Sequence, residues 1–188
     1  MKRVQITMPF LIMWAAILFL DTERICVYFL LAAAVHELGH IWAIRLCGGQ
    51  ILHFRLGALG GLIRYYLPHK TVSKEVLICI SGCLFGMMLS CVSASADIPL
   101  LCGASTILTL FNLLPLPYLD GGRALCLLIG ECRLLLFLEY FTVSLLFCLG
   151  FAAAICWHAY GLMLMAALPA ILQQSALHHR KNKGMIDI

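Results

Sequence analysis

The chain has 188 residues, of which 63% are hydrophobic and only 12% are charged. Soluble domains are about 45–50% apolar and about a quarter charged, so this composition excludes a water-soluble globule. It also excludes intrinsic disorder, which requires low hydrophobicity. The net charge of +4 comes from scattered basic residues that form no stripe with exposed aromatic side chains, so we expect no nucleic-acid partner. The composition instead predicts one membrane-embedded domain over residues 1–188.

Six apolar runs are long enough to cross a bilayer as helices, which requires about 20 residues with a range of roughly 17–25. They cover residues 4–20, 25–47, 76–95, 98–119, 134–157 and 160–177. The first run resembles a signal peptide, but no small-residue cleavage site follows it, so we expect an uncleaved signal anchor. The runs predict an all-α polytopic integral membrane protein with about six transmembrane helices.

A glycine-rich stretch over residues 48–66 separates the second run from the third. Its mixed alternation of apolar and polar residues predicts a short hairpin or re-entrant segment at the membrane interface.

The basic residues predict the orientation of these spans. Six spans place both termini on one side of the membrane. With Lys2 and Arg3 in the cytoplasm, every basic residue except Arg24 also falls on the cytoplasmic side, as the positive-inside rule requires. We therefore expect both termini in the cytoplasm.

The second run contains His36-Glu37-Leu38-Gly39-His40, an H-E-x-x-H motif on a predicted helix. Residues four apart lie about 6 Å apart along one helix face, so both imidazoles can bind one Zn²⁺. Glu37 is offset from that face, where it can reach a metal-bound water and act as a general base. Ionisable residues are costly inside a membrane span and usually functional there. The motif therefore predicts a catalytic zinc site.

A third zinc ligand is expected because catalytic zinc sites have three protein ligands and one open position. The best candidate is Asp120. It precedes the two glycines that end the segment Asn112-Leu-Leu-Pro-Leu-Pro-Tyr-Leu-Asp120-Gly-Gly. The predicted topology brings Asp120 and the two histidines to a similar depth on the cytoplasmic side. Pro115 and Pro117 break the helix, which suits a site that must admit water.

Together, the intramembrane H-E-x-x-H and the later N-x-x-P-x-P-x-L-D-G resemble the site-2 protease family of intramembrane zinc metalloproteases. The resemblance covers about residues 25–123 and is greatest to the compact bacterial branch that includes the stage IV sporulation factor FB. It implies a zinc metalloendopeptidase of a bacterial cell membrane with one Zn²⁺ per chain. His36, His40 and Asp120 would be the metal ligands and Glu37 the general base.

The resemblance also implies substrate-binding residues and partners. Asn112 matches an asparagine that helps to place the substrate, and Gly60 and Gly61 lie in a hairpin region to which an unwound substrate could add as a strand. The implied substrate is a membrane protein such as a pro-sigma or anti-sigma factor, and a regulatory membrane partner could control cleavage.

Two other functions stay open from the sequence: a metal-binding membrane transporter and a non-catalytic relative that holds client proteins. Glu139, inside the fifth run, could line a water or substrate path, or it could lie near the interface or pair with a polar neighbour. The ten cysteines include no C-x-x-C pair, and those in apolar runs, such as Cys83, are expected to pack as small hydrophobic residues.

Overall fold

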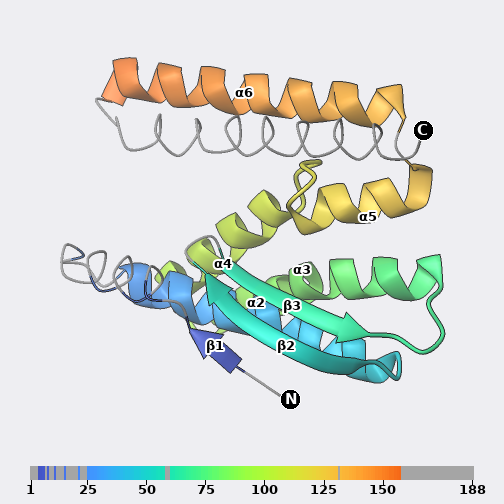
Figure 1. The fold of residues 1–188 in the computed structure, drawn as a ribbon. Helices are drawn as coiled ribbons and strands as arrows, with labels where there is room; N and C mark the ends of the chain where they lie inside the picture. The colour runs from blue at the N-terminus through green and yellow to red at the C-terminus, as the bar shows by residue number, and fades with distance from the viewer. Residues whose placement is uncertain are drawn as a thin grey trace. The chain divides into compact units, whose positions relative to one another are not determined.

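A computed structural model of the protein describes residues 4–6, 8, 11, 15, 21, 25–57, 60–130 and 132–157 (Figure 1). The chain divides into two compact units, residues 1–113 and residues 114–188. The first unit holds β1 (Val4–Ile6), α2 (Ile25–Leu46), β2 (Gln50–Gly57), β3 (Gly60–Tyr66), α3 (Val72–Ser95) and α4 (Pro99–Asn112). The second unit holds α5 (Asp120–Ile129) and α6 (Arg133–Trp157).

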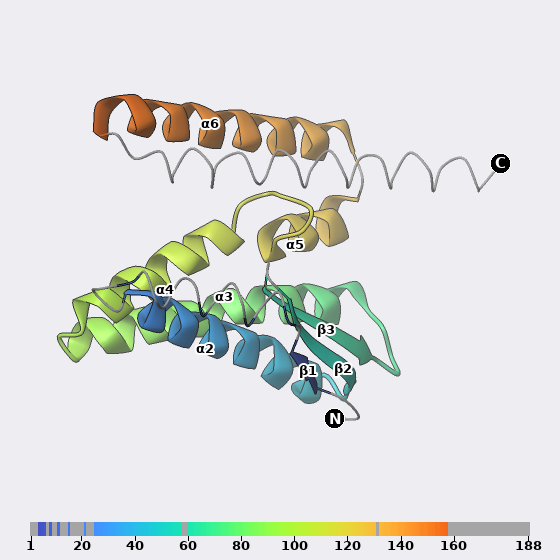
Figure 2. The same cartoon turned by 60° about the vertical axis from the view of Figure 1, so that its left-hand side comes forward.

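Two helices of the described part, α2 and α3, are long and apolar enough to cross a membrane. At 22 and 24 residues they are about 33 and 36 Å long, against a hydrocarbon core of about 30 Å. They agree with the predicted second and third spans. Figures 1 and 2 show that the two helices run in opposite directions, so Arg45 at the end of α2 and Lys74 at the start of α3 lie at the same end of the pair.

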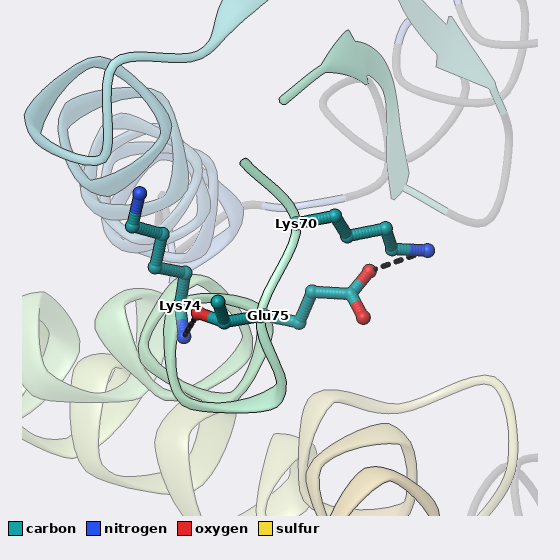
Figure 3. Close-up of polar contacts among 4 residues, drawn as sticks. Lys70, Lys74 and Glu75 are labelled. Atoms are coloured by element: carbon teal, nitrogen blue, oxygen red, sulfur yellow. Dashed lines mark hydrogen bonds and ion pairs between the residues drawn. The ribbon is translucent and has the colours of Figure 1, made fainter. Parts of the chain in front are cut away.

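Polar side chains fix the start of α3 (Figure 3). Thr71 is the N-cap residue, and its hydroxyl accepts a hydrogen bond from the Lys74 backbone N–H at 3.4 Å. Glu75, in the first turn, forms an ion pair with Lys70 at 2.9 Å. The hydrogen bond between the Lys70 ammonium and the Glu75 carboxylate raises the pKa of Lys70 above its ordinary value. A cap with an acidic residue in the first turn favours helix initiation here, just after the loop that follows β3.

The predicted hairpin is confirmed. Strands β2 and β3 pair antiparallel, with Gly57 opposite Gly60 at the turn. Strand β1 adds in parallel to the other edge of β2, with Gln5 opposite Arg55, so the sheet order is β1-β2-β3.

This third strand corrects the predicted first span. Residues 4–6 are extended rather than helical, because the alternating Val-Gln-Ile sequence suits a strand and β2 offers an unpaired edge. Met8, Leu11 and Ala15 are helical, and the other residues of the predicted run lie outside the described part.

The core of the first unit forms where the C-terminal half of α2 meets the sheet and α3. Ala43 and Ile44 of α2 pack with Ile51 of β2 and Ile78 of α3. Towards the N-terminus of α2, the same buried face contains Ala32, His36, Gly39 and His40. The residues of this face recur at helical spacing, so packing the apolar ones into the core also buries the two histidines.

The predicted fourth span is too long. Helix α4 ends at Asn112, seven residues before the predicted end at Leu119, and is about 21 Å long. Pro115 and Pro117 prevent the helix from continuing, and short turns link Leu114 to Leu116 and Leu116 to Leu119.

In the second unit, α5 begins at Asp120, and α6 begins one residue before the predicted fifth span and ends with it at Trp157. Leu135, Glu139 and Thr142 form one buried face of α6. The predicted sixth span, residues 160–177, lies outside the described residues. The described helices match the second, third and fifth predicted runs.

Candidate metal centre

The two histidines of the H-E-x-x-H motif lie together on the buried face of α2. Their Nε2 atoms are 3.2 Å apart, and their ring centroids are 4.9 Å apart. Two nitrogens that bind one tetrahedral zinc at 2.0–2.1 Å are separated by about 3.3 Å. The spacing of the pair therefore matches that of two ligands to a single metal ion.

A backbone carbonyl of α3 sets the tautomer of one of these rings. The Nδ1 atom of His40 lies 2.7 Å from the Ile78 carbonyl oxygen, and a carbonyl only accepts, so Nδ1–H is the donor. In the neutral ring, Nε2 then carries the lone pair that faces His36. This arrangement is usual in protein zinc sites, where the second ring nitrogen donates to a carbonyl or carboxylate.

Glycine at position 82 makes room for the histidines. A Cβ atom there would overlap His40 Nε2 and would lie 2.8 Å from Cε1 of His36. The α3 backbone therefore approaches the edge of both imidazoles more closely than any side chain would allow. This close approach explains why α3 presents a glycine next to the H-E-x-x-H face of α2.

Glu37 is held beside the sheet. Its Oε1 atom accepts a hydrogen bond from the backbone N–H of Gly61 at 3.3 Å. A Cβ atom at position 61 would lie 2.6–2.7 Å from the Glu37 carboxyl group, so glycine is needed for this contact. The carboxylate is thus oriented by the start of β3 rather than turned onto the metal-binding face.

A third side chain of the first unit that could bind a metal was not predicted from the sequence. The Cys83 Sγ atom lies within 4.8 Å of a ring nitrogen of His36, and both residues are buried. Cys83 sits in an apolar run, which predicts a packing role for it. Cys83 directly follows Gly82, the glycine that contacts the imidazoles. This proximity to the histidines could be predicted only if the pairing of α2 with α3 were known.

The other predicted site residues have the following positions. Asn112 is the last residue of α4, in the first unit, and its side-chain amide donates to the Leu108 carbonyl at 2.9 Å. Gly60 begins β3. Asp120 is the first residue of α5, in the second unit, and is buried. The substrate-binding roles of Asn112, Gly60 and Gly61 stay predictions, as does the role of Asp120 as a metal ligand.

Glu139, left open in the sequence analysis, is buried within α6. In the second unit its neighbours include the Tyr118 phenol. The alternatives for the role of Glu139 stay predictions.

The donor set of the first unit fits a zinc ion. Two imidazoles, one with its tautomer set by a carbonyl, and a nearby thiol are the nitrogen and sulfur ligands that zinc prefers. Oxygen-rich sites, by contrast, suit magnesium and calcium. These residues could therefore hold a zinc ion.

Comparison with known proteins supports the fold. The structure is similar to a solved structure described as "Site-2 Protease from Methanocaldococcus jannaschii", with a TM-score of 0.63 and 18% sequence identity over 92% of this chain and 89% of that one. No protein-family model matches the sequence, and a search of curated proteins finds no significant match. The chain therefore has a fold like that of a site-2 protease.

Proposed function

We propose that the protein is an intramembrane zinc metalloprotease that hydrolyses a peptide bond in or beside a transmembrane segment of another membrane protein. The observation that carries this proposal is the buried His36–His40 pair, with Nε2 atoms 3.2 Å apart and the Glu37 carboxylate held to one side. When bound, zinc would polarise the scissile carbonyl and generate a water nucleophile at neutral pH.

Glu37 is the general base in this proposal. It follows His36 directly, so its carboxylate lies off the face that holds the two imidazoles. From there it would accept a proton from the attacking water and deliver it to the leaving amine. The Gly61 N–H holds the carboxylate in an acceptor orientation before substrate arrives.

We assign the third ligand to Asp120. A carboxylate that joins two histidines is a common ligand set of catalytic zinc sites, and it leaves one position for water or substrate. Asp120 is a buried carboxylate that follows a turn with two prolines, and the matching motif of the site-2 protease family supports the assignment. Asn112, at the end of α4, is the proposed residue for placing the substrate.

The hairpin is the proposed docking edge for the substrate. In the described sheet, β3 pairs with β2 on one side only, so its other edge can accept an extended peptide. Gly60 and Gly61 begin this strand, and Gly61 contacts Glu37. A substrate strand paired there would pass next to the general base. Helical carbonyls are already hydrogen-bonded, so the substrate must unwind locally before it can pair.

The proposed setting is a bacterial cell membrane with both termini and the active site towards the cytoplasm. The location of Arg45 and Lys74 at one end of the antiparallel α2–α3 pair supports this orientation. Substrates of the pro-sigma or anti-sigma class, and control by a membrane partner as in the sporulation branch, follow from the resemblance alone.

The proposal is tested by cleavage in membranes. A library of single-span reporter proteins is co-expressed with the wild type, with Glu37→Gln, or with Glu75→Gln as the control, and new N-termini are sequenced. Glu75 is a partly buried glutamate at the start of α3 whose ion-pair partner is Lys70. We expect new N-termini within or beside apolar segments with the wild type and Glu75→Gln, and none with Glu37→Gln. Equal cleavage by all three proteins would remove Glu37 from the mechanism.

Transport is separated from proteolysis by a flux measurement. Proteoliposomes that contain the wild type should show no directional zinc flux, because the ionisable residues inside the predicted second span, His36, Glu37 and His40, lie within about one turn of α2 instead of along a path. Zinc flux that is lost in His36→Ala would favour the transporter. A non-catalytic protein that holds clients would bind reporters without cleaving them, and the wild type and Glu37→Gln would bind them equally well.

A further inference from the structure

We propose that Cys83 is itself a ligand of the metal held by His36 and His40, so that this site has a thiolate in its resting form. The inference rests on the proposed metal site and adds to it a residue that neither the sequence motifs nor the fold comparison assigns. Three observations within the first unit carry it.

The first observation is proximity. The Cys83 Sγ atom lies within 4.8 Å of a ring nitrogen of His36, and the two imidazoles meet at 3.2 Å. A nitrogen and a sulfur that bind one tetrahedral zinc, at about 2.0 and 2.3 Å, lie about 3.6 Å apart. The 4.8 Å bound exceeds this separation by about 1.2 Å, which the Cys83 side chain would have to close when a metal binds.

The second observation is the backbone that precedes the thiol. Gly82 lets α3 approach the imidazoles until a Cβ atom would overlap His40. Cys83 is the next residue of α3, so it is positioned by a packed helix and not by a loop. The third observation is burial: His36, His40 and Cys83 are all buried, so a metal bound there would be shielded from competing water ligands.

A thiolate ligand has two consequences. It makes the site prefer zinc over harder divalent cations such as magnesium and manganese, because soft sulfur ligands select softer metals. It also closes the site: two histidines, Asp120 and Cys83 would give four protein ligands, the number found in structural zinc sites, whereas catalytic sites keep one position open. Before such a site could activate a nucleophile, the Cys83 thiolate would have to leave the metal and take a proton from the water molecule that replaces it.

The test is zinc K-edge X-ray absorption of the purified full chain in detergent, which separates sulfur at about 2.3 Å from nitrogen and oxygen at about 2.0–2.2 Å. The wild type is compared with Cys83→Ser, Cys83→Ala and the matched control Cys79→Ser, which changes a buried thiol one turn earlier on α3. We expect a sulfur shell in the wild type and Cys79→Ser, and loss of that shell in both Cys83 variants. Zinc retention against a chelator should fall at least tenfold in both Cys83 variants.

Other outcomes distinguish the two proposals. One zinc per chain with only nitrogen and oxygen neighbours would overturn the role of Cys83 and leave the histidine site standing. A sulfur shell that survives in Cys83→Ser and Cys83→Ala would likewise exclude Cys83. Wild-type protein that binds no zinc would overturn the metal site itself, and with it the proposed function. Circular dichroism of each variant checks that α2 and α3 are intact.

Discussion

The Nδ1 atom of His40 donates to the Ile78 carbonyl oxygen at 2.7 Å, which ties the second histidine of the H-E-x-x-H motif on α2 to the backbone of α3. The same carbonyl accepts the Ser81 hydroxyl at 2.7 Å. The Ile78 carbonyl thus accepts from one side chain of each helix. The orientation of the imidazole therefore depends on the register of the two helices, and a shift of α3 along α2 would turn Nε2 away from His36.

Replacement of a metal ligand should remove zinc from the purified protein. We expect about one zinc per chain in the wild type and in His69→Ala, which alters an exposed loop histidine. His36→Ala and Asp120→Asn should lower zinc affinity by more than about 100-fold, because outer-shell changes alone cost 10–100-fold. Metal analysis after dialysis against a chelator measures this. Zinc content that is indifferent to Asp120 would mean that the two sequence motifs do not form one site.

Glu37→Gln should separate binding from chemistry. The amide keeps the size of the side chain but cannot accept the proton, so the cleavage rate should fall by about 10²–10⁴-fold while zinc content stays at the wild-type value. Reporter cleavage and metal analysis on the same preparation give both quantities. Loss of zinc together with activity would instead make Glu37 a ligand.

Gly82→Ala should disturb the site through packing. The added Cβ atom would overlap His40 Nε2, and neither the ring nor the helix backbone can give way without moving a ligand. We expect zinc affinity to fall about 10–100-fold, as for loss of ligand orientation, and stability to fall by about 1–3 kcal/mol from overpacking. Chelator competition and thermal unfolding in detergent measure the two effects.

The matched control for this change is Gly103→Ala in α4, where a Cβ atom would meet nothing within 4 Å. Alanine is the better helix former, so this variant should be unchanged or slightly more stable. Equal zinc affinity in the two alanine variants would contradict the close approach of α3 to the histidines.

Gly61→Ala should act on Glu37 alone. The new Cβ atom would lie 2.6 Å from the Glu37 carboxyl carbon, and the flexible carboxylate would move away from its position beside β3. Turnover should therefore fall at least about tenfold with zinc content unchanged, since a general base works only within hydrogen-bond reach. Leu62→Ala, which shortens the exposed neighbour in β3, should cleave reporters at the wild-type rate. A fall in zinc content in Gly61→Ala would show that the hairpin supports the ligands instead.

Long apolar runs predicted the helices best. The second, third and fifth runs match α2, α3 and α6 because helix propensity, apolar composition and length all favour the same structure there. The first run failed at its start, where Val4–Ile6 pair with β2: strand pairing is a long-range contact that local composition does not contain. The fourth run failed at its end, where apolar residues continue past Asn112 but two prolines do not allow a helix.

The site was predictable where its geometry is local. His36 and His40 lie four residues apart on one helix, so their meeting follows from helical periodicity. The contributions of α3 could not be predicted, because Cys83 and the Ile78 carbonyl reach the histidines only through helix packing. A cysteine in an apolar run and a backbone carbonyl carry no chemical signature in the sequence.

The short length of α4 has a consequence for the surrounding lipid. A helix of about 21 Å cannot span a hydrocarbon core of about 30 Å, so if α4 lies in the bilayer the chain leaves helical form before it reaches the interface. The Asn112 amide donates to the Leu108 carbonyl at 2.9 Å, so this side chain folds back along the last turn of α4. A bilayer relieves such mismatch by thinning around the protein. Thinning near Asn112 would shorten the path of water from the cytoplasm, so hydrolysis rates should rise in vesicles of shorter-chain lipids.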